Sequence, residues 1–281
     1  MAFTVRLARP DDVSSIVPWT TDTFEWGDYV PDRIMGWIES ADSEVIVCED
    51  DGGEPVAVAH ALMLSDTEGW LEAARVHPDH KRSGMGSAMN SFGVEWARKH
   101  GARIVRLTTE ADNVAARSQV EALGYRVTSR WVYAFFETDN HPVVGEDRRL
   151  RPAHRADVDA AWMFWSASDL AHDGRELLAD GWRWRKATPG DLAEAARAKT
   201  LYQSPSGWVI ADETGEEFMR SIWLATSPEE APRLVDSLIG LAASRSLAEL
   251  SVKTPNVPWM TETLARAGGN PKEVLVYSLA V

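Results

Sequence analysis

Apolar and polar residues alternate with two different periods along the first half of the chain, which predicts strands and helices mixed in one domain. Residues 43–49 and 55–64 are apolar runs separated by a polar turn with two glycines, and they predict an antiparallel hairpin. Residues 84–100 carry apolar positions at helical spacing and predict a long helix. The other predicted strands are 4–9, 69–76, 103–109 and 126–137, and the other predicted helices are 12–19, 31–39 and 113–123. This order favours an α+β, or mixed α/β, architecture.

A glycine-bearing loop connects the strand that ends near Val76 to the long helix. Pro78 ends the strand, and the segment 81–86 then reads Lys-Arg-Ser-Gly-Met-Gly. Glycine lets the backbone approach an anion closely, and the first amides of a helix have no partner within the helix. The pattern is therefore typical of a phosphate-binding loop, although a plain strand-to-helix connection would use the same glycines.

The chain also contains an internal repeat. Ala8-Arg9-Pro10 corresponds to Leu150-Arg151-Pro152, and Ala122-Leu123-Gly124 corresponds to Arg266-Ala267-Gly268 at an offset of 144. Pro78 corresponds to Pro228 at an offset of 150, so the second copy is expected to lack about six residues before its helix. The segment that remains, 228–232, has no glycine and contains two glutamates. Negative charge at a helix start repels a phosphate, and we expect only the first copy to bind an anion there.

The boundary between the copies is expected within the polar segment 139–146, which contains Pro142 and Gly145. The expected domains are 1–140 and 146–281. In the second copy, the pattern predicts helices at 155–168 and 190–198, with a Trp182-x-Trp184 element between them.

Composition narrows the class of protein. The 281 residues are 44% hydrophobic and 26% charged, which is ordinary for a globular protein, and no apolar run approaches the length of a membrane span. The net charge of −14 disfavours nucleic acid as a partner. Cys48 is the one cysteine, so no disulfide framework is possible, and residues 1–12 lack the apolar core of a signal peptide. A cytoplasmic location is the default expectation.

Two segments resemble the GNAT superfamily of N-acetyltransferases. Segment 81–86 resembles the acetyl-CoA motif Arg/Gln-x-x-Gly-x-Gly/Ala, with Lys81 at the Arg/Gln position. Asn113 and Ala116, followed by Leu123-Gly124-Tyr125, resemble the second motif of that family. The resemblance covers nearly all of residues 1–138. It implies two tandem GNAT-like domains, each with a mixed, mostly antiparallel sheet flanked by helices, of which the C-terminal one is degenerate.

The resemblance implies acetyl-CoA as co-substrate and no metal. A backbone N–H near Val76 would stabilise the oxyanion, and Asn113, which also suits a helix cap, would contact the pantetheine arm. The expected cofactor-binding residues are Val76, His77, Pro78, Lys81, Arg82, Ser83, Gly84, Met85, Gly86, Ser87 and Asn113.

The candidate base is Glu72, which strand alternation would place on the same face as Val76. An ordinary surface or salt-bridged glutamate is the alternative, and Glu25, Glu110 and Asp112 are further acids to consider. The family often has a tyrosine as general acid at the position of Val120, which cannot donate a proton. Either the thiolate leaves unprotonated or another residue, such as Tyr29 or Tyr133, serves.

The segment 24–31, Phe-Glu-Trp-Gly-Asp-Tyr-Val-Pro, is expected to form a wall of the acceptor site, with Glu25, Trp26 and Tyr29 as substrate-binding residues. Equally, these residues could form a turn packed on the core. The histidines at 60, 77 and 80 lack an accompanying set of metal ligands and are expected to be structural.

The resulting prediction is an N-acetyltransferase that moves acetyl directly to a small amine or amino acid in a ternary complex. The alternatives are acetylation of a protein lysine or N-terminus, and a non-catalytic acyl-CoA sensor. No nucleic acid or membrane partner is expected, and the protein is expected to be a monomer or homodimer.

Overall fold

The computed structural model describes residues 2–281 except Trp26, Asn140, Val143, Asp147 and Glu216. Its contacts divide the chain into two compact units. The first unit contains residues 1–107, 114–126 and 277–281, and the second contains residues 108–113 and 127–276. The predicted division at 139–146 describes the repeat in the sequence and remains a prediction.

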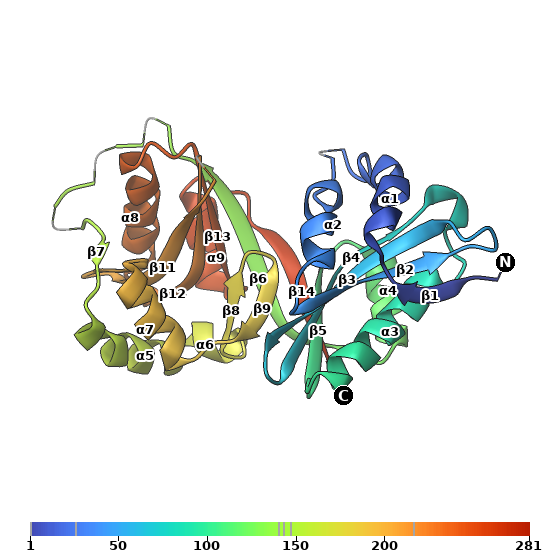
Figure 1. Ribbon diagram of the computed structural model, residues 1–281. Coiled ribbons are helices and arrows are strands. Elements are labelled where there is room, and N and C mark those ends of the chain that lie inside the picture. The colour runs from blue at the N-terminus through green and yellow to red at the C-terminus, as the bar shows by residue number, and fades with distance from the viewer. Residues whose placement is uncertain (1, 26, 140, 143, 147, 216) are drawn as a thin grey trace. The chain divides into compact units, whose positions relative to one another are not determined.

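The first unit contains most of the elements predicted from the N-terminal half (Figure 1). Its strands are β1 (Thr4–Leu7), β2 (Ser43–Glu49), β3 (Pro55–Ser65), β4 (Glu68–Val76) and the start of β5 (Ile104–Glu110). Its helices are α1 (Val13–Thr20), α2 (Val30–Ile38), α3 (Met85–Lys99) and α4 (Val114–Ala122), and short 3-10 turns cover Pro10–Asp12 and Pro78–His80. The predicted bounds of these elements are correct to within two residues.

The strands of the first unit follow the order β1-β2-β3-β4-β5. All neighbouring pairs are antiparallel except β4 and β5, which are parallel. One apolar cluster lies on the α3 side of the sheet and includes Leu71, Met85 and Met89. A second cluster, which includes Ile16 and Ile34, joins α1 and α2 to the other side. Helices thus cover both faces, and residues of β4 contribute to both clusters.

The second unit repeats this order of elements with an inserted hairpin. Its main sheet follows the order β6-β13-β12-β11-β10-β7. The strands are β6 (Arg126–Glu137), β7 (Arg151–Pro152), β10 (Leu201–Ser204), β11 (Gly207–Thr214), β12 (Phe218–Ala225), β13 (Glu249–Pro255) and β14 (Lys272–Ala280), with the separate hairpin β8 (Leu177–Asp180) and β9 (Arg183–Lys186). The helices are α5 (Val158–Ser166), α6 (Asp169–Asp173), α7 (Pro189–Ala198), α8 (Ala231–Ser244) and α9 (Pro258–Arg266), and a 3-10 turn covers Arg155–Asp157.

Local geometry supports the sequence repeat at two points. Gly124 after α4 and Gly268 after α9 both have φ of +94°, a left-handed conformation that ends a helix without a side-chain clash. At the other end of each copy, the carboxylate of Asp12 accepts the backbone N–H of Arg9, and that of Asp157 accepts the N–H of His154. The fold class is confirmed: the chain is a mixed α/β protein whose two units each contain a mostly antiparallel sheet flanked by helices.

The connection before the long helix is shorter in the second half, as the sequence suggests, but the expected difference was too large. Residues 77–84 connect β4 to α3, whereas residues 226–230 connect β12 to α8. The second connection is therefore shorter by three residues rather than about six. The difference is smaller because β12 ends earlier, and α8 begins later, than the correspondence with β4 and α3 predicts. In the described part of the chain, no helix combines the length and apolar character needed to cross a membrane.

Candidate active site

The loop between β4 and α3 has a conformation that only a few residue types adopt easily. Gly84 lies just before α3 with φ of +86°, and Arg82 has φ of +63°. The Ser83 hydroxyl donates to the backbone oxygen of His80 at 2.6 Å, which fixes the turn from the 3-10 segment into the helix. Met85 is fully buried and anchors the start of α3 in the core. The hydrogen bond of Ser83 and the buried Met85 thus fix the loop, while Lys81, Arg82 and Gly84 stay exposed.

The backbone amides of this loop point to an anion site. Within the described chain, the backbone N–H groups of residues 82–87 donate no hydrogen bond. The first backbone hydrogen bond of α3 runs from Ala88 N–H to the Gly84 oxygen at 3.0 Å. A Cβ on Gly84 would meet no atom within 4 Å, so the space above that residue is open. Unpartnered amides at a helix start, with Lys81 and Arg82 beside them, suit a phosphate group.

Gly86 faces a residue that sequence reasoning did not assign to the loop. A Cβ at Gly86 would lie 2.8 Å from the Nε2 atom of Gln119 in α4, so the glycine allows this side chain to approach. The pairing of glycine and amide could not be read from the sequence, because it depends on how α3 and α4 pack.

A β-bulge interrupts β4 between the candidate base and the loop. Arg75 pairs with Val58 and Glu72 pairs with His60, so Ala73 and Ala74 together oppose one residue of β3. Ala73 has φ of +57°, an unusual value for an alanine in a strand. The extra residue reverses the alternation of side chains beyond the bulge.

The expectation that Glu72 and Val76 share a face is therefore wrong. Val76 packs against the cluster on the α3 side. Glu72 instead contacts His60, whose ring stacks on Trp37 of α2. Plain alternation fails here because a bulge adds one residue to the strand, and nothing in the sequence of this segment marks it.

Glu72 has a defined hydrogen-bonding environment. Its Oε1 atom lies 3.0 Å from Nδ1 of His60, and its Oε2 atom accepts the indole N–H of Trp70 at 3.0 Å. The carboxyl side chain is 13% exposed, whereas His60 and Trp70 are each 1% exposed. The carboxylate thus lies at the edge of the core and keeps some exposed surface, whereas His60 and Trp70 are buried.

The segment before α2 lies over the bulged end of β4. Arg75 forms a two-point ion pair with Asp28, from Nε to Oδ2 at 2.6 Å and from Nη2 to Oδ1 at 3.2 Å. Its guanidinium also lies 4.8 Å from the ring centre of Phe24 and 5.6 Å from that of Tyr29. Burial opposes ionisation of Asp28, but the hydrogen bond and charge of Arg75 outweigh it and lower the pKa of that carboxyl.

Of the three predicted substrate-binding residues, the structure describes Glu25 and Tyr29 in this segment, and Trp26 lies outside the described residues. Glu25 is exposed in the turn. Tyr29 contacts Trp37 edge-on at 6.0 Å between ring centres. Partial burial, followed by the negative charge of Glu72, raises the pKa of the Tyr29 phenol, which therefore keeps its proton at neutral pH. The charge of Glu72 thus acts on Tyr29, as expected of two residues assigned to one site.

The other candidate residues, namely Asn113, Glu110, Asp112 and Tyr133, belong to the second unit. Asn113 donates its backbone N–H to the oxygen of Glu110, just before α4. Tyr133 and Glu110, considered separately as acid and base, bond to each other at 2.8 Å, and burial together with Glu110 raises the pKa of the Tyr133 phenol. Asp112 is exposed. The cofactor role of Asn113 remains a prediction, and Val120, in the first unit, is 8% exposed and offers no donor.

The corresponding region of the second unit differs in chemistry. Glu230 immediately precedes α8 and accepts from the Ser206 hydroxyl at 2.8 Å and from Arg233 at 2.7 Å. These bonds, that of Ser206 first, lower the pKa of Glu230, so its negative charge occupies the helix start. Strands β12 and β13 stop pairing after Arg220 and Ser251. Beyond these residues lies only a small cavity of about 10 Å³, which is lined by Trp131, Trp165, Leu177, Trp223, Leu224, Lys253 and Pro255.

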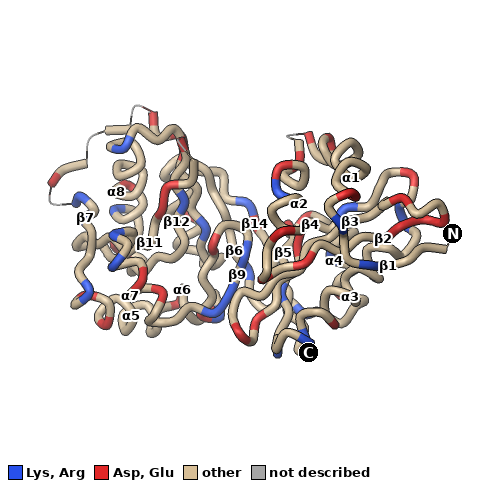
Figure 2. The backbone as a smooth tube through the Cα atoms, in the orientation of Figure 1, with Lys and Arg blue, Asp and Glu red and all other residues tan. Residues whose placement is uncertain are grey.

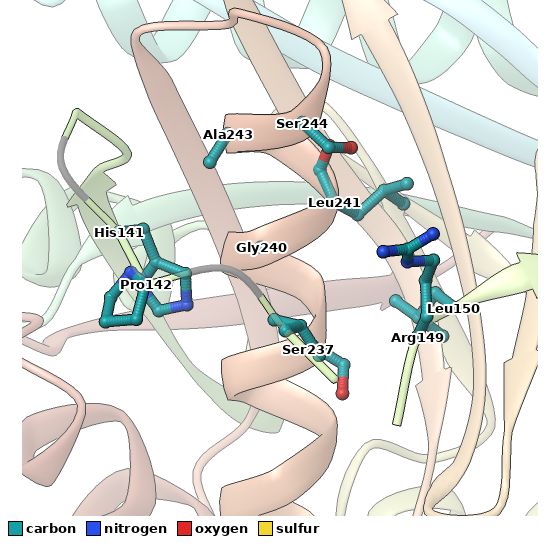
Figure 3. Close-up of a pocket in the computed structure, with 10 residues that line it drawn as sticks. His141, Pro142, Arg149, Leu150, Ser237, Gly240, Leu241, Ala243 and Ser244 are labelled. Atoms are coloured by element: carbon teal, nitrogen blue, oxygen red, sulfur yellow. The ribbon is translucent and has the colours of Figure 1, made fainter. Parts of the chain in front are cut away.

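A separate cavity of about 220 Å³ lies in the second unit against α8 (Figure 3). Its lining is mainly apolar, with His141, Arg149 and two serines as polar members. None of the predicted site residues lines it. Lys and Arg are interspersed with Asp and Glu in both units, rather than gathered in one (Figure 2). Among the described residues, no group of three or more His, Cys, Asp or Glu side chains could hold a metal ion.

Comparison with known proteins agrees with this geometry. Residues 13–125 match the model of the acetyltransferase (GNAT) family. A histidine N-acetyltransferase from Oreochromis niloticus is 21% identical over an alignment of 223 residues, which covers 73% of this chain and 64% of the length of that relative.

Solved structures share the fold over nearly the whole chain. A GCN5-related N-acetyltransferase from Sphaerobacter thermophilus superposes with a TM-score of 0.69 at 16% identity, covering 99% of this chain and 95% of the other. A tandem GNAT protein from the clavulanic acid biosynthesis pathway gives a TM-score of 0.62 at 14% identity, covering 99% and 98%. Residues 13–125, which contain the amide-lined loop and the strand before it, thus match the GNAT family, and the chain as a whole shares the fold of GNAT-related structures.

Proposed function

We propose that this protein is an acetyl-CoA-dependent N-acetyltransferase that acts on the amine of a small molecule or amino acid. The observation that carries the proposal is the arrangement of β4 and the loop after it. Unpartnered amides of residues 82–87 offer an anion site, and Glu72, four residues before the end of β4, offers a carboxylate beside Tyr29 and Trp37. One short stretch of chain thus supplies a place for the cofactor diphosphate and a base for the acceptor.

The residues of the loop fit the cofactor. The main-chain amides of 82–87 would bind the diphosphate, with Lys81 and Arg82 contributing positive charge. The parallel pairing of β4 with β5 covers Glu68 to Trp70 only, so the edge of β4 from Leu71 onward is available to hydrogen-bond the pantetheine arm. Bound acetyl-CoA would supply the acetyl group and accept the electron pair of the broken C–S bond as thiolate.

The acceptor amine must lose a proton before or as it attacks, because an alkylammonium has no free electron pair. Glu72 would take this proton, directly or through one water molecule. The amine would add to the thioester carbonyl, and a backbone N–H near Val76 would stabilise the negative oxygen of the resulting tetrahedral intermediate. The C–S bond would break as that intermediate collapses and the carbonyl re-forms. Tyr29 keeps its proton at neutral pH and is the candidate donor to the thiolate in the first unit.

A small acceptor is favoured over a protein by the surroundings of Glu72. Aromatic side chains lie near this carboxylate: Trp37 stacks on its partner His60, and Tyr29 lies close enough for the charge of Glu72 to raise its pKa, and aromatic faces suit a compact cation. Since the relative from Oreochromis niloticus is named a histidine N-acetyltransferase, free amino acids, histidine first, are the acceptors to test.

The test is a panel of amines incubated with acetyl-CoA, in which released thiol is followed with a thiol-reactive dye and product by mass spectrometry. The panel contains free amino acids, polyamines, amino sugars and short peptides with a free N-terminus or lysine. Release that depends on a small amine supports the proposal. Release with peptides alone would favour a protein acetyltransferase, and tight CoA binding without any release would favour an acyl-CoA sensor.

A further inference from the structure

His60 is a polar partner of Glu72 and comes from the neighbouring strand. The two residues face each other in the antiparallel pair of β3 and β4, on the side of the bulge nearer the hairpin turn. His60 Nδ1 lies 3.0 Å from Glu72 Oε1. An ionised carboxylate can only accept a hydrogen bond, so Nδ1 must carry the proton. The contact therefore fixes the tautomer of His60 while Glu72 is charged.

His60 cannot reach a substrate itself. The side chain is 1% exposed, and its second nitrogen, Nε2, is buried without a hydrogen-bond partner in the described chain. The ring stacks on Trp37 with 4.3 Å between centres and 10° between planes. A buried imidazole held in this way acts on the reaction only through the residue that it contacts.

The geometry limits the motion of the Glu72 carboxylate. His60 holds Oε1, and the indole of Trp70, itself buried, holds Oε2. A glutamate in water samples many rotamers, and fixing one of them before reaction removes part of the entropic cost of the proton transfer. Because stacking on Trp37 restricts rotation of the His60 ring, His60 can fix the direction of one carboxylate oxygen.

We propose that His60 is a positioning residue that orients the Glu72 carboxylate for proton abstraction. This inference rests on the proposed function of Glu72 as base. Glu72 remains the group that would touch the amine, and His60 sets where its oxygen lone pairs point.

The chain allows a test with matched variants. In His60→Asn, the amide nitrogen stands where Nδ1 stood and can still donate to Glu72, whereas His60→Phe keeps a flat ring against Trp37 without a donor. His60→Gln moves the donor toward the position of Nε2. We expect His60→Phe to lower kcat by roughly 10- to 100-fold with the KM of acetyl-CoA unchanged, His60→Asn to stay within about 5-fold of wild type, and His60→Gln to resemble His60→Phe.

A pH profile separates positioning from mere folding. A carboxylate that loses a donor is protonated more easily, so the acid limb of kcat/KM should move to higher pH in His60→Phe and return in His60→Asn. Tyr29 responds to the charges of Glu72, Arg75 and Asp28, and Tyr29, Arg75 and Asp28 are unchanged in all variants. Wild-type kcat and an unmoved acid limb in a folded His60→Phe would overturn the proposal, as would equal losses in His60→Phe and His60→Asn.

A measurement without catalysis keeps the two proposals apart. In protein labelled with ¹⁵N at histidine, the His60 signals are assigned by their loss in His60→Asn, and the proton is expected on Nδ1 at neutral pH. Glu72→Gln should shift these signals. A proton on Nε2 alone would overturn the positioning role even in an active enzyme. If no amine is acetylated but the Nδ1 proton and its response to Glu72→Gln are found, the proposed function fails while the His60–Glu72 contact stands.

Discussion

The guanidinium of Arg75 and the carboxylate of Asp28 form a two-point ion pair that ties the segment before α2 to the bulged end of β4. The Asp28 side chain has no exposed surface, and the arginine is 13% exposed. Because the bulge turns Arg75 and Glu72 to the same side, this ion pair positions the predicted acceptor wall relative to the candidate base.

Replacing Arg75 by Met should destabilise the protein by about 3 kcal/mol, because Asp28 would remain as an unpaired charge out of water. The double variant Asp28→Asn with Arg75→Met should recover part of that loss. Urea denaturation of the wild type, both single variants and the double variant measures the coupling. Additive losses would show that the ion pair does not couple these two residues.

Glu72→Gln should lower kcat by roughly 10²- to 10⁴-fold, since an amide cannot take the proton of the amine. The dissociation constant of CoA should stay the same, because the loop 82–87 is unaffected. Glu39→Gln, at an exposed glutamate just after α2, is the matched control and should behave like wild type. Wild-type turnover in Glu72→Gln would reject the base assignment.

Gly84→Ala should weaken CoA binding at least 10-fold, because its Cβ would stand in the open space above the amides. Gly53→Ala is a close control: Gly53 lies in the same unit with φ of +85°, against +86° for Gly84, and it also has open space around it. Both variants should lose about 1 kcal/mol of stability from the left-handed backbone. Calorimetry with CoA distinguishes them, and equal affinities would argue against a diphosphate at Gly84.

We expect one CoA per chain in a calorimetric titration. In the second unit, Glu230 occupies the start of α8 and tryptophans fill the space beyond the paired part of β12 and β13. The double variant Glu229→Gln with Glu230→Gln should still bind one equivalent, since removing charge does not supply the missing loop. Two equivalents in the wild type would mean that the C-terminal copy also binds cofactor.

Lys253 should make stability rise with pH in a window above neutrality. Burial first, and then the positive charge of Arg220, lowers the pKa of this lysine from 10.5 to about 8, against the opposing effect of Asp180. The side chain is 5% exposed, with its ammonium 4.9 Å from the ring centre of Trp182 and 3.3 Å from the Ser251 hydroxyl. Between about pH 8 and pH 10.5 the unfolded chain holds the proton more tightly than the folded one, so the free energy of unfolding increases with pH.

Below pH 8 the full cost of charging the buried amine remains, and Lys253→Met removes it. We expect this variant to gain about 2–3 kcal/mol at pH 7, with the gain shrinking toward pH 10. Lys272→Met, at an exposed lysine of β14, is the control and should change little at either pH. A constant difference between Lys253→Met and wild type from pH 7 to pH 10 would contradict the lowered pKa.

The sequence by itself determined the elements of the first half, the repeat, and the loop 81–87. These features depend on local chemistry: apolar periodicity defines the strands and helices, and glycine at position 84 permits a positive φ that few other residues adopt. The partner of Glu72 was not within reach, since counting back from the hairpin turn at Asp66-Thr67 gives Ala61, and a register shift between Met63 and Ser65 makes the partner His60.

Only the tertiary structure decided which side of the sheet Glu72 faces and what surrounds it. One extra residue in the bulge at Ala73 reverses the alternation, and a bulge arises from the pairing of two strands rather than from the sequence of one. The stacking of Trp37 on His60, the ion pair of Arg75 with Asp28 and the approach of Gln119 to Gly86 join residues distant in sequence. Such contacts depend on how helices pack on the sheet, which no local pattern encodes.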